Sequence, residues 1–197
     1  LAAGLDLNSA SGTASPSGHG AIVSLAVDDS GVIDLFQLEP DHAPRRITYA
    51  RGDDIAPALS PDGREVVFST ARWNELMHYD LALMDLSTGA VRQLTSGDDG
   101  DLDSRWAPDG TRIAFGRRGW ESRKNALCIL SPEAERPICW ASDLLRTVAG
   151  WLDASHVLIV KDSLGKSRAV SVNVETGEES AYDIPWHVRA LSVSPDG

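Results

Sequence analysis

The chain has 197 residues, of which 42% are hydrophobic and 24% charged, so it is long enough to bury a substantial core. The net charge of −11 and the pI of about 4.8 argue against binding to nucleic acid or to anionic membranes, because both need a basic surface. No stretch approaches the roughly 18 apolar residues of a membrane-spanning helix, so no transmembrane segment is expected.

The first 18 residues are small and polar, being rich in Ala, Ser and Gly. Such a segment buries too little apolar surface to offset the entropy of ordering it. We therefore predict a flexible leader over residues 1–18. The apolar patch at Leu5 to Leu7 leaves open the alternative that this segment supplies a strand to a blade.

After the leader, one turn signature recurs along the chain. It reads Ser60-Pro61-Asp62-Gly63 before the apolar run 66–68, and Ala107-Pro108-Asp109-Gly110 before the apolar run 113–115. Proline presets the first corner of a β-turn, glycine accepts the positive φ that closes it, and aspartate caps nearby N–H groups. Weaker copies begin at Ser15 and Leu152, and a full copy occupies 194–197.

The copies are spaced by 45 residues from Pro16 to Pro61, 47 from Pro61 to Pro108, and 87, about two periods, from Pro108 to Pro195. A period in the forties with several short apolar strands is typical of a β-propeller, in which each repeat forms one four-stranded antiparallel blade. The apolar runs are short and bounded by Gly, Pro, Asp and Ser, which disfavours a helical repeat. The predicted fold class is therefore all-β.

In chain order, we predict blades at residues 19–51, 52–98, 99–142 and 143–184, and a partial fifth at 185–197. An open propeller leaves unpaired edges and an uncovered blade face. Four blades and a partial fifth therefore suggest a fragment of a larger ring. A small closed ring completed by the leader is the alternative.

The second repeat carries the clearest family resemblance. Its segments 57–63, 66–68, 80–85 and 91–95 read Pro-Ala-Leu-Ser-Pro-Asp-Gly, Val-Val-Phe, Asp-Leu-Ala-Leu-Met-Asp and Val-Arg-Gln-Leu-Thr. They resemble the WD40-like (PD40) repeats of TolB-like β-propeller proteins, and the resemblance extends over about residues 20–197. It implies the propeller fold and an exported, periplasmic or extracellular setting. It carries over no catalytic role, because the motif residues build turns and cores.

The two cysteines are candidates for a disulfide. A shift of one 45-residue unit places Cys128 on Leu83 and Cys139 on Leu94, which are expected on neighbouring strands of one hairpin. Cross-strand neighbours have Cβ atoms roughly 4.5 to 5.5 Å apart, close to the spacing that a disulfide needs. An extracytoplasmic setting favours the bridge. The alternative is that both residues are reduced and fill leucine sites in the core.

No catalytic, cofactor-binding or metal-binding residues are expected. The five histidines are scattered, and neither Gly-x-Ser-x-Gly nor His-Glu-x-x-His occurs. The cluster of Asp98, Asp99, Asp101 and Asp103 resembles the alternating carboxylates of calcium loops, so calcium is the one cofactor left open. It fails the EF-hand pattern, because Ser104 and Gly110 stand where that pattern needs Gly and Glu.

A basic loop offers a candidate partner-binding site. Trp120 lies between the predicted strands of the third blade, with Arg117 and Arg118 beside it, and Trp and Arg are frequent binding hot spots. The alternative is that Trp120 packs between blades. The leading hypothesis is an exported, non-catalytic scaffold that binds a protein or peptide. The competing hypothesis is the substrate-gating propeller of a prolyl-oligopeptidase-like serine peptidase whose catalytic domain lies outside this chain.

Overall fold

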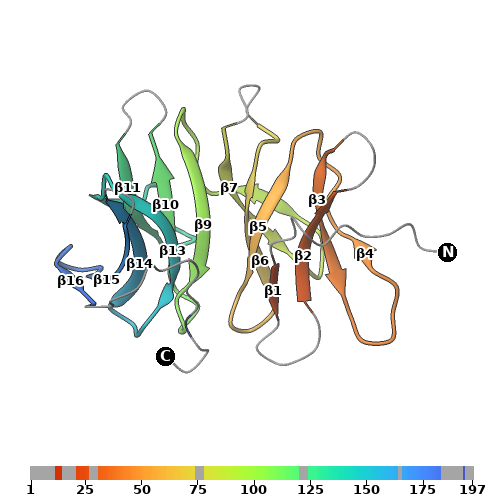
Figure 1. The fold of residues 1–197 in the computed structure, drawn as a ribbon. Coiled ribbons are helices and arrows are strands. Elements are labelled where there is room, and N and C mark those ends of the chain that lie inside the picture. The colour runs from red at the N-terminus through yellow and green to blue at the C-terminus, as the bar shows by residue number, and fades with distance from the viewer. Residues whose placement is uncertain are drawn as a thin grey trace. The chain divides into compact units, whose positions relative to one another are not determined.

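The computed structural model describes residues 12–14, 21–26, 31–73, 78–119, 124–163, 166–182 and 193. Within these ranges every regular element is a β-strand, and the strands form four-stranded antiparallel sheets (Figure 1). The chain divides into two compact units, Leu1–Gly97 and Asp98–Gly197, with two sheets in each. The described residues contain no helix with the length and apolarity needed to cross a membrane.

Unit 1 holds the first two blades. The first consists of β1 (Gly12–Ala14), β2 (Ala21–Ala26), β3 (Ile33–Leu38) and β4 (Arg45–Arg46). The second consists of β5 (Asp54–Leu59), β6 (Glu65–Thr70), β7 (Asp80–Asp85) and β8 (Val91–Gln93). Buried side chains of both blades form one apolar core: Ile22, Leu35, Val66, Phe68, Ala82 and Met84.

Unit 2 holds the third and fourth blades. The third consists of β9 (Gly100–Trp106), β10 (Ile113–Arg118), β11 (Asn125–Leu130) and β12 (Ile138–Ala141). The fourth consists of β13 (Leu145–Trp151), β14 (His156–Ser163), β15 (Lys166–Asn173) and β16 (Glu179–Ala181). Trp151 and Val148 of the fourth blade pack with Leu127 and Ala114 of the third in a shared core. In every sheet the strands are hydrogen-bonded in chain order, so each blade is a simple meander.

The prediction of an all-β propeller fragment with four-stranded blades is confirmed. The leader prediction needs one correction, because Gly12–Ala14 pair with β2 as the first strand of a blade. The Leu5 to Leu7 patch lies outside the described residues. So does the partial fifth blade except for Val193, which packs against the buried face of the fourth blade that contains Ala149 and Leu158.

The recurring turns owe their shape to aspartate. Asp62 accepts hydrogen bonds from the Ser60 hydroxyl at 2.7 Å and the Arg64 N–H at 3.1 Å, and these bonds lower the pKa of its carboxyl. Asp109 accepts from Thr111 in the same way. Asp153, in the degenerate fourth copy, accepts from the Ser155 and His156 N–H groups at 2.7 and 2.8 Å. The sequence signature is therefore a structural turn in the second, third and fourth blades.

The first strands of the second and third blades share a backbone feature that the sequence did not reveal. Ala56 in β5 and Asp103 in β9 have φ angles of 51° and 57°, and the strand register shifts beside each. A β-bulge inserts one extra residue and bends its strand. Because neither residue is glycine, both bulges adopt a conformation that L-residues disfavour.

Candidate partner-binding surfaces

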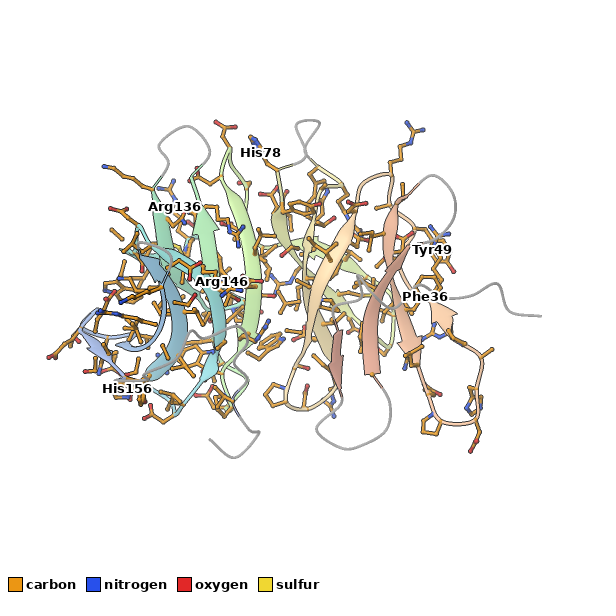
Figure 2. All side chains as sticks on the ribbon, in the orientation of Figure 1. Phe36, Tyr49, His78, Arg136, Arg146 and His156 are labelled. Carbon is orange, nitrogen blue, oxygen red and sulfur yellow. A yellow bond between two sulfur atoms is a disulfide. The ribbon has the colours of Figure 1, made fainter. Side chains whose placement is uncertain are left out.

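Each blade has one end at which its second strand leads to its third, and we call this its loop end. In an antiparallel meander, the start of the first strand and the end of the fourth lie at the same end. The described residues at the loop ends of unit 1 therefore include 47–53, 71–73 and 78–79, and those of unit 2 include 119, 124, 142–146, 161–163 and 166–168. Figure 2 shows Tyr49 and Arg146 within these segments.

A buried carboxylate organises the loop end of the second blade. Asp54 is fully buried, and its two oxygens accept hydrogen bonds from the Thr70 hydroxyl at 2.5 Å and from Arg72 Nη2 at 2.7 Å. Burial raises the pKa of the Asp54 carboxyl, and the bonds from Thr70 and Arg72 oppose that rise. The Arg72 guanidinium is thereby fixed at the surface end of this network.

Arg72 in turn positions an exposed aromatic ring. Its guanidinium carbon lies 5.3 Å from the ring centre of the buried Phe68 and 5.5 Å from that of Trp73. The Trp73 side chain is 41% exposed. A cation over an aromatic face is held electrostatically by the ring quadrupole, so Trp73 is presented to solvent in a fixed orientation.

The first blade repeats this arrangement with different residues. Arg46 forms an ion pair with the fully buried Asp34, and its Nε donates to the Thr48 carbonyl at 2.9 Å. The Arg46 guanidinium carbon lies 4.6 Å from the centre of the Tyr49 ring, and the Tyr49 hydroxyl donates to the Arg46 carbonyl at 3.1 Å. Tyr49 is nevertheless 72% exposed.

The two arrangements are joined through Thr48 and Gly52. The Thr48 hydroxyl donates to Asp34 at 2.9 Å and also helps to hold down the pKa of Asp54. A Cβ on Gly52 would lie 2.8 Å from the Ala71 carbonyl carbon, so the segment that follows Tyr49 packs directly on the segment that precedes Trp73. We call Arg46, Tyr49, Arg72 and Trp73 together the aromatic–arginine surface.

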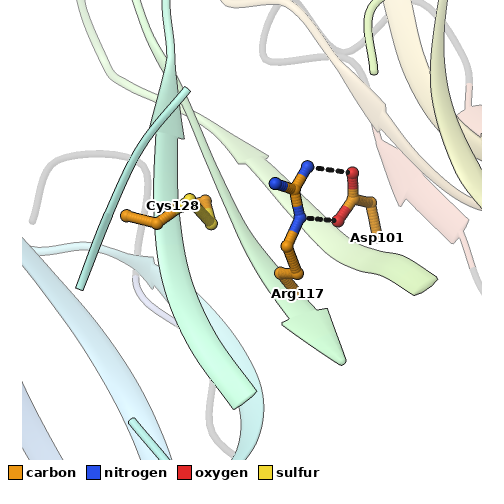
Figure 3. Close-up of a disulfide and its surroundings, with 4 residues drawn as sticks. Asp101, Arg117 and Cys128 are labelled. Carbon is orange, nitrogen blue, oxygen red and sulfur yellow. Dashed lines mark hydrogen bonds and ion pairs between the residues drawn. A yellow bond between two sulfur atoms is a disulfide. The ribbon is translucent and has the colours of Figure 1, made fainter. Parts of the chain in front are cut away.

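The corresponding ion pair of the third blade involves one of the predicted partner-binding residues. Arg117 Nε and Nη2 donate to the two carboxylate oxygens of the buried Asp101, each at 2.8 Å (Figure 3). The Arg117 guanidinium also lies 5.7 Å from the centre of the buried Phe115 ring. Arg117 is therefore a structural partner of Asp101, which weakens its candidacy as a contact residue.

The other two predicted partner-binding residues differ in what the structure describes. Arg118 is exposed, donates to the Arg146 carbonyl at 3.0 Å, and lies 3.9 Å from Asp103. Trp120 lies outside the described residues. Of the predicted group, Arg118 is thus the residue that the structure places at an accessible surface.

Cys128 and Cys139 face each other across β11 and β12 and are joined by a disulfide (Figure 3). Their Cα atoms are 4.1 Å apart. The prediction that they are cross-strand neighbours is confirmed, but the alignment behind it was wrong. In the second blade Leu83 pairs with Arg92, not with Leu94. The turn between β11 and β12 is longer than that between β7 and β8, which shifts the register.

Two carboxylates of the acidic cluster at residues 98–103 lie near different arginines rather than facing a common site. Asp101 uses both carboxylate oxygens on Arg117, and Asp103 lies near Arg118. The described residues contain no group of three or more His, Cys, Asp or Glu side chains arranged to hold a metal ion. Calcium binding stays a prediction that only a titration can test.

Ser155, His156 and Asp153 lie together at the turn before β14, but their hydrogen bonds do not form a catalytic relay. The Ser155 hydroxyl donates to Asp153 at 3.1 Å, and His156 Nδ1 lies 3.0 Å from the same carboxylate. A relay needs the serine on the histidine. This group is therefore a capped turn.

Sequence reasoning missed the aromatic–arginine surface. Neither Tyr49 nor Trp73 is among the residues predicted from the sequence for partner binding. One usable signal existed: in both blades an arginine near the end of a strand precedes an aromatic residue by one or three positions, at Arg72-Trp73 and Arg46 to Tyr49. The buried aspartates that fix these arginines come from other strands, so only the fold brings them together.

Comparisons with known proteins agree with this architecture. A TolB homolog of Chlorobium luteolum is 32% identical over 71 residues, which are 36% of this chain and 16% of that protein. A solved structure assigned as TolB from Agrobacterium tumefaciens matches with a TM-score of 0.73 at 17% identity, over 85% of this chain and 62% of that one. TolB from Acinetobacter baumannii matches with a TM-score of 0.68 at 18% identity, over 87% and 42%.

A prolyl endopeptidase structure also matches, with a TM-score of 0.61 at 13% identity, over 90% of this chain and 27% of that one. No protein-family model matches. The chain thus spans less than two thirds of each of these relatives, and identities this low in the solved structures establish the fold rather than the activity. The chain has a TolB-like β-propeller fold.

Proposed function

We propose that this chain is a non-catalytic, exported β-propeller module that binds a protein or peptide partner. The observation that carries the proposal is the aromatic–arginine surface, where Tyr49 and Trp73 are exposed and each is held by an arginine fixed to a buried aspartate. Rigid Trp, Tyr and Arg side chains lose little conformational entropy on binding, which is why they dominate binding energy at interfaces.

The similarity to TolB proteins supports the proposal of a propeller that binds a protein. The disulfide between Cys128 and Cys139 supports export, because disulfides persist in oxidising compartments. Neither observation names the partner.

A display library of random peptides tests the proposal. The library is selected on wild-type protein, and each enriched peptide is then measured against the Tyr49→Ala/Trp73→Ala variant and against Tyr182→Ala, a control that removes another exposed aromatic side chain. We expect enriched peptides to lose at least tenfold in affinity on the double variant and to bind the control normally. Enriched peptides that bind all three proteins equally would reject the aromatic–arginine surface as the binding site.

The second candidate is the gating propeller of a serine peptidase, favoured by the prolyl endopeptidase match. The full-length gene product distinguishes the two functions. Labelling of that product by a fluorophosphonate, abolished when the serine of a Gly-x-Ser-x-Gly segment is replaced, would establish the peptidase. A full-length product that carries no such segment and is not labelled would support the binding module.

A further inference from the structure

The loop end of unit 2 carries basic side chains that the aromatic–arginine surface does not involve. Arg118 and Arg146 are linked by the hydrogen bond from Arg118 to the Arg146 carbonyl, at 3.0 Å. Arg146 Nη1 lies 3.5 Å from the Ser167 hydroxyl. Lys166 and Arg168 flank Ser167 on β15, so their side chains leave the opposite face of the strand at the same end of the blade. All four basic side chains are exposed. We call Arg118, Arg146, Lys166 and Arg168 the basic surface.

The carboxylates near this surface offset its charge only in part. Asp103 lies 3.9 Å from Arg118 and Asp162 lies 3.8 Å from Arg146, and both distances are beyond hydrogen-bond range. Asp162 also accepts the Ser167 hydroxyl at 2.6 Å. Asp98 and Asp99 precede β9 at the loop end of the third blade, so the excess of positive charge lies toward the fourth blade.

Arg168 is the most informative member of the basic surface. It lies near the start of β15, the third strand of its blade, and the equivalent position carries Asp34 and Asp80 in the first two blades. The equivalence follows from matching hydrogen bonds: Tyr182 N–H donates to the Ala169 carbonyl as Leu94 N–H donates to the Leu81 carbonyl. The fourth blade thus has an exposed cation where the first two blades have an aspartate.

The surroundings of Arg168 do not neutralise it. Its cross-strand neighbour on β14 is Lys161, and like charges in this position destabilise a sheet. Lys161 is bonded to Glu179, with Nζ–oxygen distances of 2.9 and 2.8 Å, so that carboxylate is already used. In the described part of the chain, Arg168 has no ion-pair partner. A bound anion would offset this repulsion.

We propose that the basic surface binds an acidic peptide segment of a partner protein. Guanidinium groups bind carboxylates through paired hydrogen bonds, and Arg118, Arg146 and Arg168 supply three of them. Leu144, which is 47% exposed, lies beside the surface because its carbonyl accepts the Asp162 N–H at 2.8 Å, and it offers an apolar contact. The net charge of −11 opposes extended polyanions, which favours a short acidic segment.

The proposal rests on the proposed binding function but assigns a second surface with its own partner chemistry. The binding function proposed for the aromatic–arginine surface and the acidic-peptide site proposed here can fail separately. The Tyr49→Ala/Trp73→Ala variant leaves every member of the basic surface in place. That variant is therefore included in the test below, and it should bind the acidic probe as the wild type does.

The probe is a fluorescein-labelled oligoglutamate peptide, with the oligoglutamine peptide of equal length as its control, measured by fluorescence anisotropy at low ionic strength. The test variant is Lys166→Gln/Arg168→Gln, whose exposed positions should tolerate the change. The matched control is Arg136→Gln, which removes an exposed arginine at the turn between β11 and β12, the opposite end of the third blade from its loop end.

We expect oligoglutamate to bind the wild type and oligoglutamine not to bind. Lys166→Gln/Arg168→Gln should weaken binding about tenfold, as expected for the loss of two exposed charge pairs, and Arg136→Gln should leave it unchanged. Equal losses in both variants would show an effect of net charge alone and overturn the proposal, as would absence of oligoglutamate binding. Binding of anionic lipid vesicles that the double variant abolishes, without peptide binding, would reassign the surface to a membrane.

Discussion

The two units use arginine differently at their loop ends, although their blades share the same four-stranded architecture. In unit 1, Arg46 and Arg72 are paired with the buried Asp34 and Asp54, and their role is to hold Tyr49 and Trp73 in place. In unit 2, Arg117 is paired with Asp101 in the same manner, yet Arg146 and Arg168 remain exposed. The buried pairs thus belong to the architecture, whereas the remaining loop-end residues set the surface chemistry.

If the buried ion pairs belong to the architecture, breaking one should lower the unfolding free energy more than breaking an exposed pair. Replacement of Asp101 by alanine would leave the mostly buried Arg117 guanidinium without its carboxylate, which should cost about 3 to 5 kcal/mol of unfolding free energy. Asp162→Ala, which removes an exposed carboxylate 3.8 Å from Arg146, should cost less than about 1 kcal/mol. Urea unfolding followed by tryptophan fluorescence measures both. Similar losses would mean that Asp101–Arg117 behaves as a surface pair.

The disulfide is a second feature in which unit 2 departs from unit 1. The equivalent hairpin of unit 1 pairs Leu83 with Arg92 and has no bridge. The Cys128–Cys139 bond closes a loop with a sequence separation of 11 residues, and a loop of this size should contribute roughly 3 kcal/mol through the entropy of the unfolded chain.

Reduction should therefore lower the Tm of the wild type and leave a Cys128→Ala/Cys139→Ala variant unaffected. Mass spectrometry of protein alkylated under denaturant without reduction provides the direct check. Alkylation of both thiols in the unreduced protein would show that the bridge is absent.

Two hairpin glycines, Gly89 in unit 1 and Gly177 in unit 2, differ in how closely other residues pack on them. Gly89 and Gly177 have φ angles of 72° and 75°, but a Cβ on Gly89 would meet nothing within 4 Å, whereas one on Gly177 would lie 2.2 Å from Trp140 Cδ1. Gly89→Ala should cost about 1 kcal/mol from the backbone alone. Gly177→Ala should cost roughly 2 to 4 kcal/mol, because Trp140 must also move. Equal Tm shifts for the two variants would mean that Trp140 does not pack on this turn.

Acid should weaken the turns that both units share. The pKa values of Asp62, Asp109 and Asp153 are lowered in the folded state, chiefly by the Ser60 hydroxyl, the Thr111 N–H and the Ser155 N–H, respectively. Their stabilisation is complete above the unfolded carboxyl pKa of 3.8 and is lost as the pH falls through the lower folded values. Asp54, whose pKa burial raises, acts in the opposite sense: its contribution is present below 3.8 and is lost as the pH rises through its folded value.

Unfolding free energies measured at neutral pH and near pH 3 test this balance. Asp109→Asn should reduce the loss of stability on acidification, because one lowered carboxyl is removed. Asp54→Asn should enlarge that loss, because the opposing group is removed. The same pH dependence in both variants would contradict the assigned directions.

The sequence was most informative where chemistry is local. The turn formed by Ser60 to Gly63 needs proline, aspartate and glycine at fixed positions, so its repetition revealed the blades and their period. The pairing of Cys128 with Cys139 was also predictable, although a turn of different length invalidated the alignment to Leu94.

The surfaces were less predictable because their residues come from separate strands. Tyr49 and Trp73 are positioned by arginines that are held in turn by Asp34 and Asp54. Each aspartate is distant in sequence from the arginine that it holds. The bulges at Ala56 and Asp103 were hidden for a related reason, since neither residue is the glycine that a positive φ normally indicates.

Backbone amide NMR of the protein titrated with oligoglutamate tests most directly whether the two loop ends differ in binding chemistry. We expect chemical-shift changes centred on Arg118, Arg146, Lys166 and Arg168, with Tyr49 and Trp73 unaffected. Changes centred on Tyr49 and Trp73, or spread evenly over both units, would contradict the account.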